Sequence, residues 1–135
     1  AIIEAYTKYS QNYPDRFFLY QNLSRIEYIN LLRNARFMLG NSSSGLLEAP
    51  SLKLPAINIG SRQRGRIHGN NMIFVDNDRK EIATAIDQAL HNQEFLAKVN
   101  QGVNPYGDGK SAAKAVTALA EAKLDKELIF KNITY

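Results

Sequence analysis

Residues 36–66 constrain the fold most strongly, because short apolar runs there alternate with polar stretches bounded by glycine. The apolar run at 37–39 is typical of a strand buried on both faces, and the run at 55–59 indicates a second buried strand. A polar turn at 40–45 separates them, and the apolar content that resumes at 46–49 predicts a short helix. We therefore expect a three-layer α/β domain with a mostly parallel sheet.

The polar turn has the chemistry of a ligand site. A parallel sheet places such a turn at the carboxyl end of a strand, where α/β proteins bind their ligands. The serines at 42–44 offer hydroxyls and amides to an anion such as phosphate, and Gly45 permits close approach to the backbone. Glu48, one turn later, is placed to accept hydrogen bonds from two sugar hydroxyls. Arg62 opens a basic loop whose side chains are suited to phosphate oxygens.

A purely structural interpretation of the same residues stays open on spacing alone. A serine before a helix often only caps the first helical amides, and the arginines at 62–66 would then belong to a solvated loop. A P-loop is excluded, because Leu46 and Leu47 stand where that motif requires Lys and Ser or Thr.

Periodicity and capping residues predict the remaining elements. Further strands are expected at 17–20 and 72–75. Helices are expected at 1–13, lying on a sheet, at 93–99 and at 112–122. A helix at 24–35 would begin with a Ser24–Glu27 capping box and direct Ile26, Ile29, Leu32 and Ala35 inward. A helix at 78–90 would be capped by Asp78 and direct Ile82, Ala83, Ile86 and Ala89 inward.

Composition narrows the classes of function. The 135-residue chain has no cysteine and 2 histidines, which argues against disulfides and metal clusters, so we expect no metal and no cofactor. No apolar run approaches a membrane span and no signal peptide is visible, so the cytoplasm is the expected compartment. The net charge is +4, but aromatic residues do not interleave with the cluster at 62–66. We therefore predict neither nucleic-acid nor membrane binding.

Three motifs in order carry a resemblance to a known family. Residues 40–50 read GNSSSGLLEAP, residues 58–66 read NIGSRQRGR, and residues 104–111 read NPYGDGKS. Together they resemble the carboxyl-terminal part of the UDP-N-acetylglucosamine 2-epimerase family, over roughly residues 17–123. The likeness is closest to the hydrolysing branch, since the other branch has a different serine turn and Arg-Glu where this chain has Arg62-Gln63.

The resemblance implies a fold and a set of binding roles. It implies a GT-B architecture, in which this chain is the second Rossmann-like domain and holds UDP, or UDP-N-acetylglucosamine, in the cleft. Ser42 and Ser43 would contact the diphosphate and Glu48 the ribose hydroxyls. Arg62 would approach the phosphates or the sugar, and Gly45 would permit close backbone contact.

The resemblance also implies that part of the enzyme is missing. Family members are far longer, and the amino-terminal domain with the carboxylates that handle the C2 proton has no counterpart here. We therefore interpret residues 1–123 as a partial UDP-binding domain with a tail or helix extension at 124–135, and assign no catalytic residue. The fragment is expected to be inactive alone, to have the missing domain as its partner, and to be homo-oligomeric at full length.

Two other classes of function remain open at this point. The chain would also fit the nucleotide-binding half of a GT-B glycosyltransferase, or a non-catalytic interaction domain of the same fold. Within the epimerase interpretation the sugar is undetermined, and a 2,4-diacetamido sugar is an alternative to N-acetylglucosamine.

Overall fold

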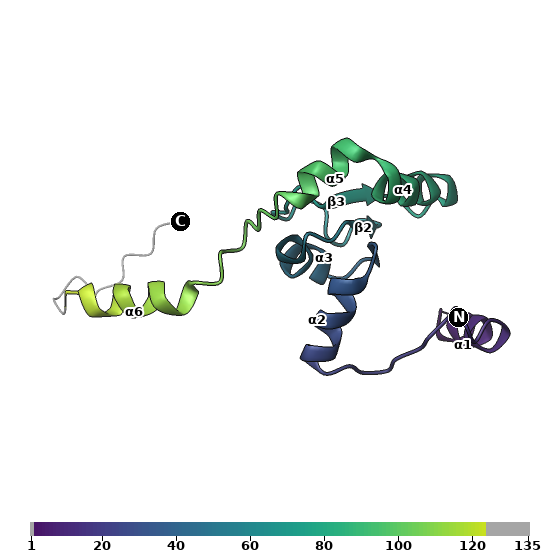
Figure 1. Ribbon diagram of the computed structural model, residues 1–135, viewed down its shortest axis with the longest axis horizontal. Helices are drawn as coiled ribbons and strands as arrows, with labels where there is room; N and C mark the ends of the chain where they lie inside the picture. Colours follow the sequence, from purple (N-terminus) through teal and green to yellow (C-terminus); the bar gives the residue numbers. More distant parts are fainter. Residues whose placement is uncertain (1, 124–135) are drawn as a thin grey trace.

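A parallel three-stranded sheet forms the centre of the molecule (Figure 1). The computed structural model describes residues 2–123, so the predicted tail at 124–135 lies outside the described residues. The strands β1 (Met38–Gly40), β2 (Ala56–Ile59) and β3 (Met72–Val75) pair in the order β1-β2-β3. The predicted α/β class with a parallel sheet is therefore confirmed.

One face of the sheet is covered by helix α2 (Arg25–Asn34) and the short helices α3 (Ser44–Leu47) and η1 (Ala49–Leu52). Met38, Ala56 and Met72 lie in register across the three strands and face these helices. They pack with the buried residues of this layer, which are Leu32, Ala49 and Leu54.

The opposite face is covered by α4 (Arg79–His91) and α5 (Gln93–Asn100). The Asp78 carboxylate accepts hydrogen bonds from the amides of Lys80 and Glu81 in the first turn of α4, so the predicted cap is present. Ala83 was expected inward but is exposed, because the apolar stripe with helical spacing passes through Ala85 instead. The core of this layer consists of Ile57, Val75, Ala85, Ala89, Phe95 and Val99.

The segment before α2 departs from expectation. Helix α1 (Ile2–Asn12) forms, but it buries no residue and does not lie on the sheet (Figure 1). The strand predicted at 17–20 is absent from the described chain. A strand requires a neighbouring strand to satisfy its backbone, and none of β1 to β3 pairs with this segment. Phe17 instead packs its ring 5.4 Å from that of Tyr9, beside Tyr13.

Ile26 and Leu39 were expected to be buried but are exposed, because the parts of α2 and β1 that carry them are not covered by other elements. The Ser24–Glu27 capping box opens α2 as predicted, but Ile26 is 76% exposed because the first turn of α2 extends beyond the sheet (Figure 1). Leu39 is 45% exposed, so β1 is not buried on both faces. It shares a face with Ile57, but β1 is an edge strand and α4 packs over β2 and β3.

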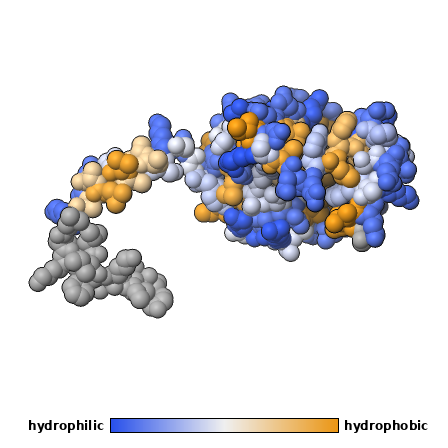
Figure 2. Space-filling model, turned by 90° about the horizontal axis from the view of Figure 1, so that it is seen from below, coloured by the Kyte–Doolittle hydropathy of each residue, from blue (hydrophilic) through white to orange (hydrophobic). Residues whose placement is uncertain are grey.

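The last described helix stands apart from the body. Helix α6 (Ser111–Glu121) matches the prediction in position, and it buries no residue. Figure 2 shows it extending away from the rounded body, with apolar side chains on its surface. None of the helices within residues 2–123 combines the length and the apolar composition that a membrane-spanning helix requires.

Candidate functional site

The turn after β1 and the loop after β2 lie side by side at the carboxyl edge of the sheet. We call residues 41–44 the serine turn and residues 60–66 the basic loop. Gln63 is only 2% exposed, and its Nε2 donates a 2.9 Å hydrogen bond to the carbonyl oxygen of Asn41. The two segments that sequence analysis placed in one site are therefore in direct contact.

The serines of the turn differ in how far the fold uses their hydroxyls. Ser43 is the N-cap of α3, yet its side chain makes no capping hydrogen bond. Ser42 is exposed, and its Oγ accepts a 3.3 Å bond from the amide of Ser44. Ser44 is buried and accepts a 2.8 Å bond from the hydroxyl of Tyr28. Capping therefore explains Ser42 in part and does not explain Ser43.

Helix α3 contributes little as a dipole, because it is a single turn. The anion-binding capacity of the turn rests on its local donors instead. Within the described chain, the backbone amides of Ser42 and Ser43 donate to no protein acceptor. These amides and the hydroxyls of Ser42 and Ser43 are the groups available to a phosphate.

Gly45 has a packing role that the sequence did not reveal. A Cβ at this position would lie 3.2 Å from the Cβ of Ala56 and 3.4 Å from the Sδ of Met72. The carbonyl of Gly45 accepts a 3.0 Å bond from the buried Asn71 side chain. The absence of a side chain thus lets α3 sit directly on β2 and β3, while contact with a ligand stays a prediction.

Glu48 lies at the end of α3 with its carboxylate partly open to solvent. Its Oε1 is 3.5 Å from a guanidinium nitrogen of Arg25, and the two side chains are 22% and 76% exposed. An ion pair this exposed is weak and leaves most acceptor positions of the carboxylate free. Glu48 therefore retains the capacity to accept bonds from hydroxyl groups.

The arginines of the basic loop have different partners. Arg62 is exposed and has no ion pair within the described residues. Arg64 forms a 2.8 Å ion pair with Asp76 at the end of β3. The NH1 group of Arg66 donates a 2.7 Å hydrogen bond to the Oε1 of Gln63. Sequence analysis used Gln63 only as a mark of the hydrolysing branch and gave it no role in the site.

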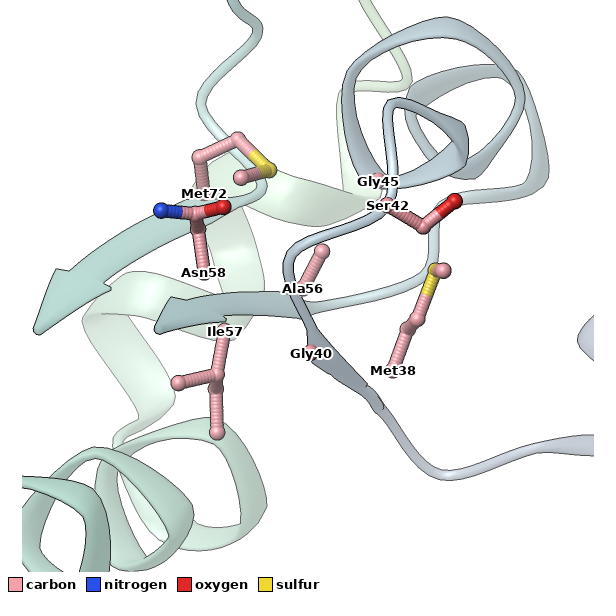
Figure 3. Close-up of a pocket in the computed structure, with 8 residues that line it drawn as sticks. All are labelled: Met38, Gly40, Ser42, Gly45, Ala56, Ile57, Asn58 and Met72. Atoms are coloured by element: carbon pink, nitrogen blue, oxygen red, sulfur yellow. The ribbon is translucent and has the colours of Figure 1, made fainter. Parts of the chain in front are cut away.

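A buried amide on β2 holds the start of the basic loop and lies close to the serine turn. Asn58 is 2% exposed, and its Nδ2 donates a 2.9 Å bond to the carbonyl of Gly60. Its Oδ1 has no partner and lies beside a cavity of about 10 Å³, which has room for about one water molecule. Figure 3 shows this oxygen on the side of Gly45 and Ser42. The cavity is lined by Met38, Gly40, Ser42, Gly45, Ala56, Ile57, Asn58 and Met72.

The third motif docks against the first two. The Nδ2 of Asn104 donates to the carbonyl of Leu47 at 2.9 Å and to the hydroxyl of Ser51 at 2.8 Å. The hydroxyl of Tyr106 donates a 2.8 Å bond to the carbonyl of Ile67, just after the basic loop. The third motif therefore contacts the end of α3 and the segment that follows the basic loop, which sequence order alone did not establish.

Among residues 2–123, no three His, Asp or Glu side chains are grouped so that they could hold a metal ion. His68 lies near the basic loop, with its Nδ1 3.0 Å from the carbonyl of Gly69 and its ring 5.0 Å from that of Phe74.

Asp108 stabilises the turn in which it lies, because its carboxylate accepts a hydrogen bond from the amide of Lys110. Its hydrogen bonds with the Lys110 amide, and secondarily with the Lys114 side chain, lower the pKa of its carboxyl.

Comparison with known proteins gives consistent matches. A family model described as UDP-N-acetylglucosamine 2-epimerase matches residues 1–120. The chain is 36% identical over 85% of its length to a UDP-N,N'-diacetylbacillosamine 2-epimerase (hydrolyzing) of Legionella pneumophila. It is 31% identical over 97% of its length to the polysialic acid biosynthesis protein P7 of Escherichia coli. It is 38% identical over 70% of its length to a GDP/UDP-N,N'-diacetylbacillosamine 2-epimerase (hydrolyzing) of Campylobacter jejuni.

These matches cover only part of each relative. The aligned segments span 29%, 33% and 24% of the three relatives, respectively. The chain therefore corresponds to about a third or less of proteins of this kind.

Proposed function

This chain belongs to the UDP-N-acetylglucosamine 2-epimerase family, and from that premise we propose that it forms the UDP-binding part of a hydrolysing 2-epimerase. The observation that carries the proposal is the direct contact between the serine turn and the basic loop through Gln63 and Asn41. That contact gathers hydroxyls, backbone amides and guanidinium groups at one edge of the sheet. A diphosphate requires such a set of donors.

Each site residue takes a defined part in this proposal. Ser42 and Ser43 bind the diphosphate through hydroxyls and amides, and Arg62 adds a positive charge. Glu48 accepts hydrogen bonds from the ribose hydroxyls, which its partial exposure and weak pairing with Arg25 permit. Gly45 keeps the backbone of the turn close to both the sheet and the nucleotide.

The whole enzyme would convert UDP-N-acetylglucosamine to N-acetylmannosamine and UDP. A base removes the proton at C2 while the bond from C1 to the diphosphate oxygen breaks, so that UDP leaves and a glycal forms. Water then adds across the double bond, giving the hydroxyl at C1 and a new hydrogen on the opposite face of C2. Residues of this chain position UDP and stabilise the charge that develops on the departing diphosphate. The base would come from outside this chain.

Residues 1–123 would then act as a partial domain that completes its cleft with an amino-terminal domain, in an oligomeric cytoplasmic enzyme. A GT-B glycosyltransferase half is the weaker proposal, because the three relatives named above include two 2-epimerases and no glycosyltransferase. The same two names favour a 2,4-diacetamido sugar as a second candidate substrate. Both substrates carry UDP, so the proposed roles of Ser43 and Glu48 are the same for either.

Titration of the chain with UDP, with binding measured by calorimetry or NMR, tests the proposal. We expect saturable binding that weakens in Glu48→Ala and in Arg62→Ala. Glu94→Ala serves as the matched control, because Glu94 is an exposed carboxylate on α5 that pairs only with Lys98 among the described residues. Absence of binding at about millimolar UDP by a folded chain would contradict the proposal. Release of UDP from UDP-N-acetylglucosamine by this chain alone would contradict the assignment of the base to another part of the enzyme.

A further inference from the structure

The arginines of the basic loop are not equivalent cations. Arg64 is hydrogen-bonded to the carboxylate of Asp76 at 2.8 Å. Arg62 is exposed, and within residues 2–123 it has no charged partner that would fix its position. Arg66 is bound at 2.7 Å to the side chain of Gln63, which is itself bonded to the serine turn. Only Arg66 is thus both held in place and free of a carboxylate among the described residues.

We propose that Arg66 is a diphosphate-binding residue of this site and that Gln63 is its positioning residue. This inference rests on the proposed function and extends it, since sequence analysis assigned the arginine contact to Arg62. Arg66 binds the phosphate oxygens directly. Gln63 sets the distance between the Arg66 guanidinium and the serine turn.

The orientation of the Gln63 amide is dictated by its two partners. The carbonyl of Asn41 can only accept a hydrogen bond, so the Gln63 nitrogen faces it. The Gln63 oxygen is therefore directed to Arg66, whose guanidinium can only donate. Gln63 is 2% exposed, so water has little access to its own end of either bond. A glutamate here would have no donor for Asn41, whereas a glutamine satisfies both neighbours.

Arg66 keeps most of its binding capacity after this bond forms. A guanidinium has five N–H donors, and one of them is used on Gln63. The residue is exposed, so the remaining donors are open to a ligand. A prepositioned arginine loses less conformational freedom on binding than an unanchored one such as Arg62, which favours Arg66 as the stronger contact.

The test is a set of UDP titrations of the 135-residue chain and its variants. We expect Arg66→Ala to weaken UDP binding about tenfold or more, because a charged hydrogen bond is lost. Arg64→Ala removes the same charge from the same loop and should weaken binding less than about threefold, since that charge is already paired. Binding by Arg66→Ala should also fall less steeply with added salt than binding by Arg64→Ala.

Gln63→Glu tests the positioning role. It should weaken UDP binding several-fold, and the double variant with Arg66→Ala should bind about as weakly as Arg66→Ala alone, because both changes remove one contact. The matched control is Gln93→Glu, the same chemical change at an exposed position on α5. If Gln63→Glu does not fold, Gln63→Ala takes its place in the same comparison with Arg66→Ala, and Arg66→Ala beside Arg64→Ala still tests Arg66.

The outcomes separate this inference from the proposed function. If the unmodified chain binds UDP and Glu48→Ala weakens it, but Arg66→Ala and Arg64→Ala have equal effects, the role of Arg66 is overturned and the UDP site stands. Additive effects of Gln63→Glu and Arg66→Ala would overturn the positioning role of Gln63. A chain that binds no UDP would overturn the proposed function and this inference with it.

Discussion

The side-chain nitrogen of Gln63 donates a 2.9 Å hydrogen bond to the carbonyl oxygen of Asn41, 22 positions earlier in the chain. This bond joins the segment that leaves β1 to the segment that leaves β2, two neighbouring parallel strands. Parallel strands direct their carboxyl ends to the same edge, but they do not by themselves fix how the following loops meet. One buried amide makes that connection here.

Replacing Gln63 should therefore lower stability as well as UDP affinity. We expect Gln63→Ala to reduce the free energy of unfolding by about 1–2 kcal/mol, because a buried side chain and its hydrogen bonds are lost. Urea unfolding followed by circular dichroism measures this. Gln93→Ala, at an exposed position, should change the same quantity by less than about 0.5 kcal/mol. Equal losses in the two variants would show that Gln63 does not join the loops.

Asn71 should prove equally important beneath the turn. Its Nδ2 donates to the carbonyl of Gly45 at 3.0 Å and to the carbonyl of Leu54 at 3.1 Å. Asn71→Leu would leave two buried carbonyls unpaired, partly offset by removal of the Asn71 Oδ1, which already lacks a partner. We expect a net loss of about 2 kcal/mol in urea unfolding. Asn70→Leu, at the exposed neighbouring position, is the control and should change little. A small effect of Asn71→Leu would mean that α3 is held by apolar contact alone.

Local patterns predicted the elements whose formation depends mostly on local sequence. The apolar runs became β2 and β3, and the Ser24–Glu27 spacing became the capping box of α2. The prediction of a strand at 17–20 was wrong because a strand depends on a partner strand elsewhere in the chain, which no local pattern encodes. Leu39 was misjudged for a similar reason, since its exposure follows from the edge position of β1.

The residues of the candidate site likewise fall into those that local sequence predicts and those that depend on the completed fold. Ser42, Ser43 and Glu48 could be proposed from the sequence because their spacing on one turn and one short helix is a local property. The burial of Gln63 could not, because nothing in the basic loop indicates which polar side chain turns inward. The docking of Asn104 on Leu47 spans 57 positions and likewise depends on the completed fold.

The capping box makes part of the stability pH-dependent. Hydrogen bonds with Ser24, from its side chain first and then its backbone, lower the pKa of Glu27 in the folded state. A lowered folded pKa means that this contribution is fully present above the unfolded pKa of about 4.3 and is lost as the pH falls through the folded value. The difference in unfolding free energy between the unmodified chain and Glu27→Gln should therefore be constant near neutral pH and should shrink on acidification. A difference that does not change with pH would contradict this assignment.

The hydroxyl of Tyr106 provides the last test, because one hydrogen bond connects it to Ile67, the residue that follows the basic loop. This hydroxyl donates a 2.8 Å hydrogen bond to the carbonyl of Ile67, so Tyr106→Phe removes one hydrogen bond and little else. We expect the free energy of unfolding to fall by about 1 kcal/mol or less, and amide hydrogen exchange in residues 61–67 to accelerate. Tyr13→Phe is the matched control, since the Tyr13 hydroxyl has no hydrogen bond within residues 2–123. If exchange in the loop is unchanged by Tyr106→Phe, the position of the loop is determined by Gln63 and the sheet rather than by the third motif.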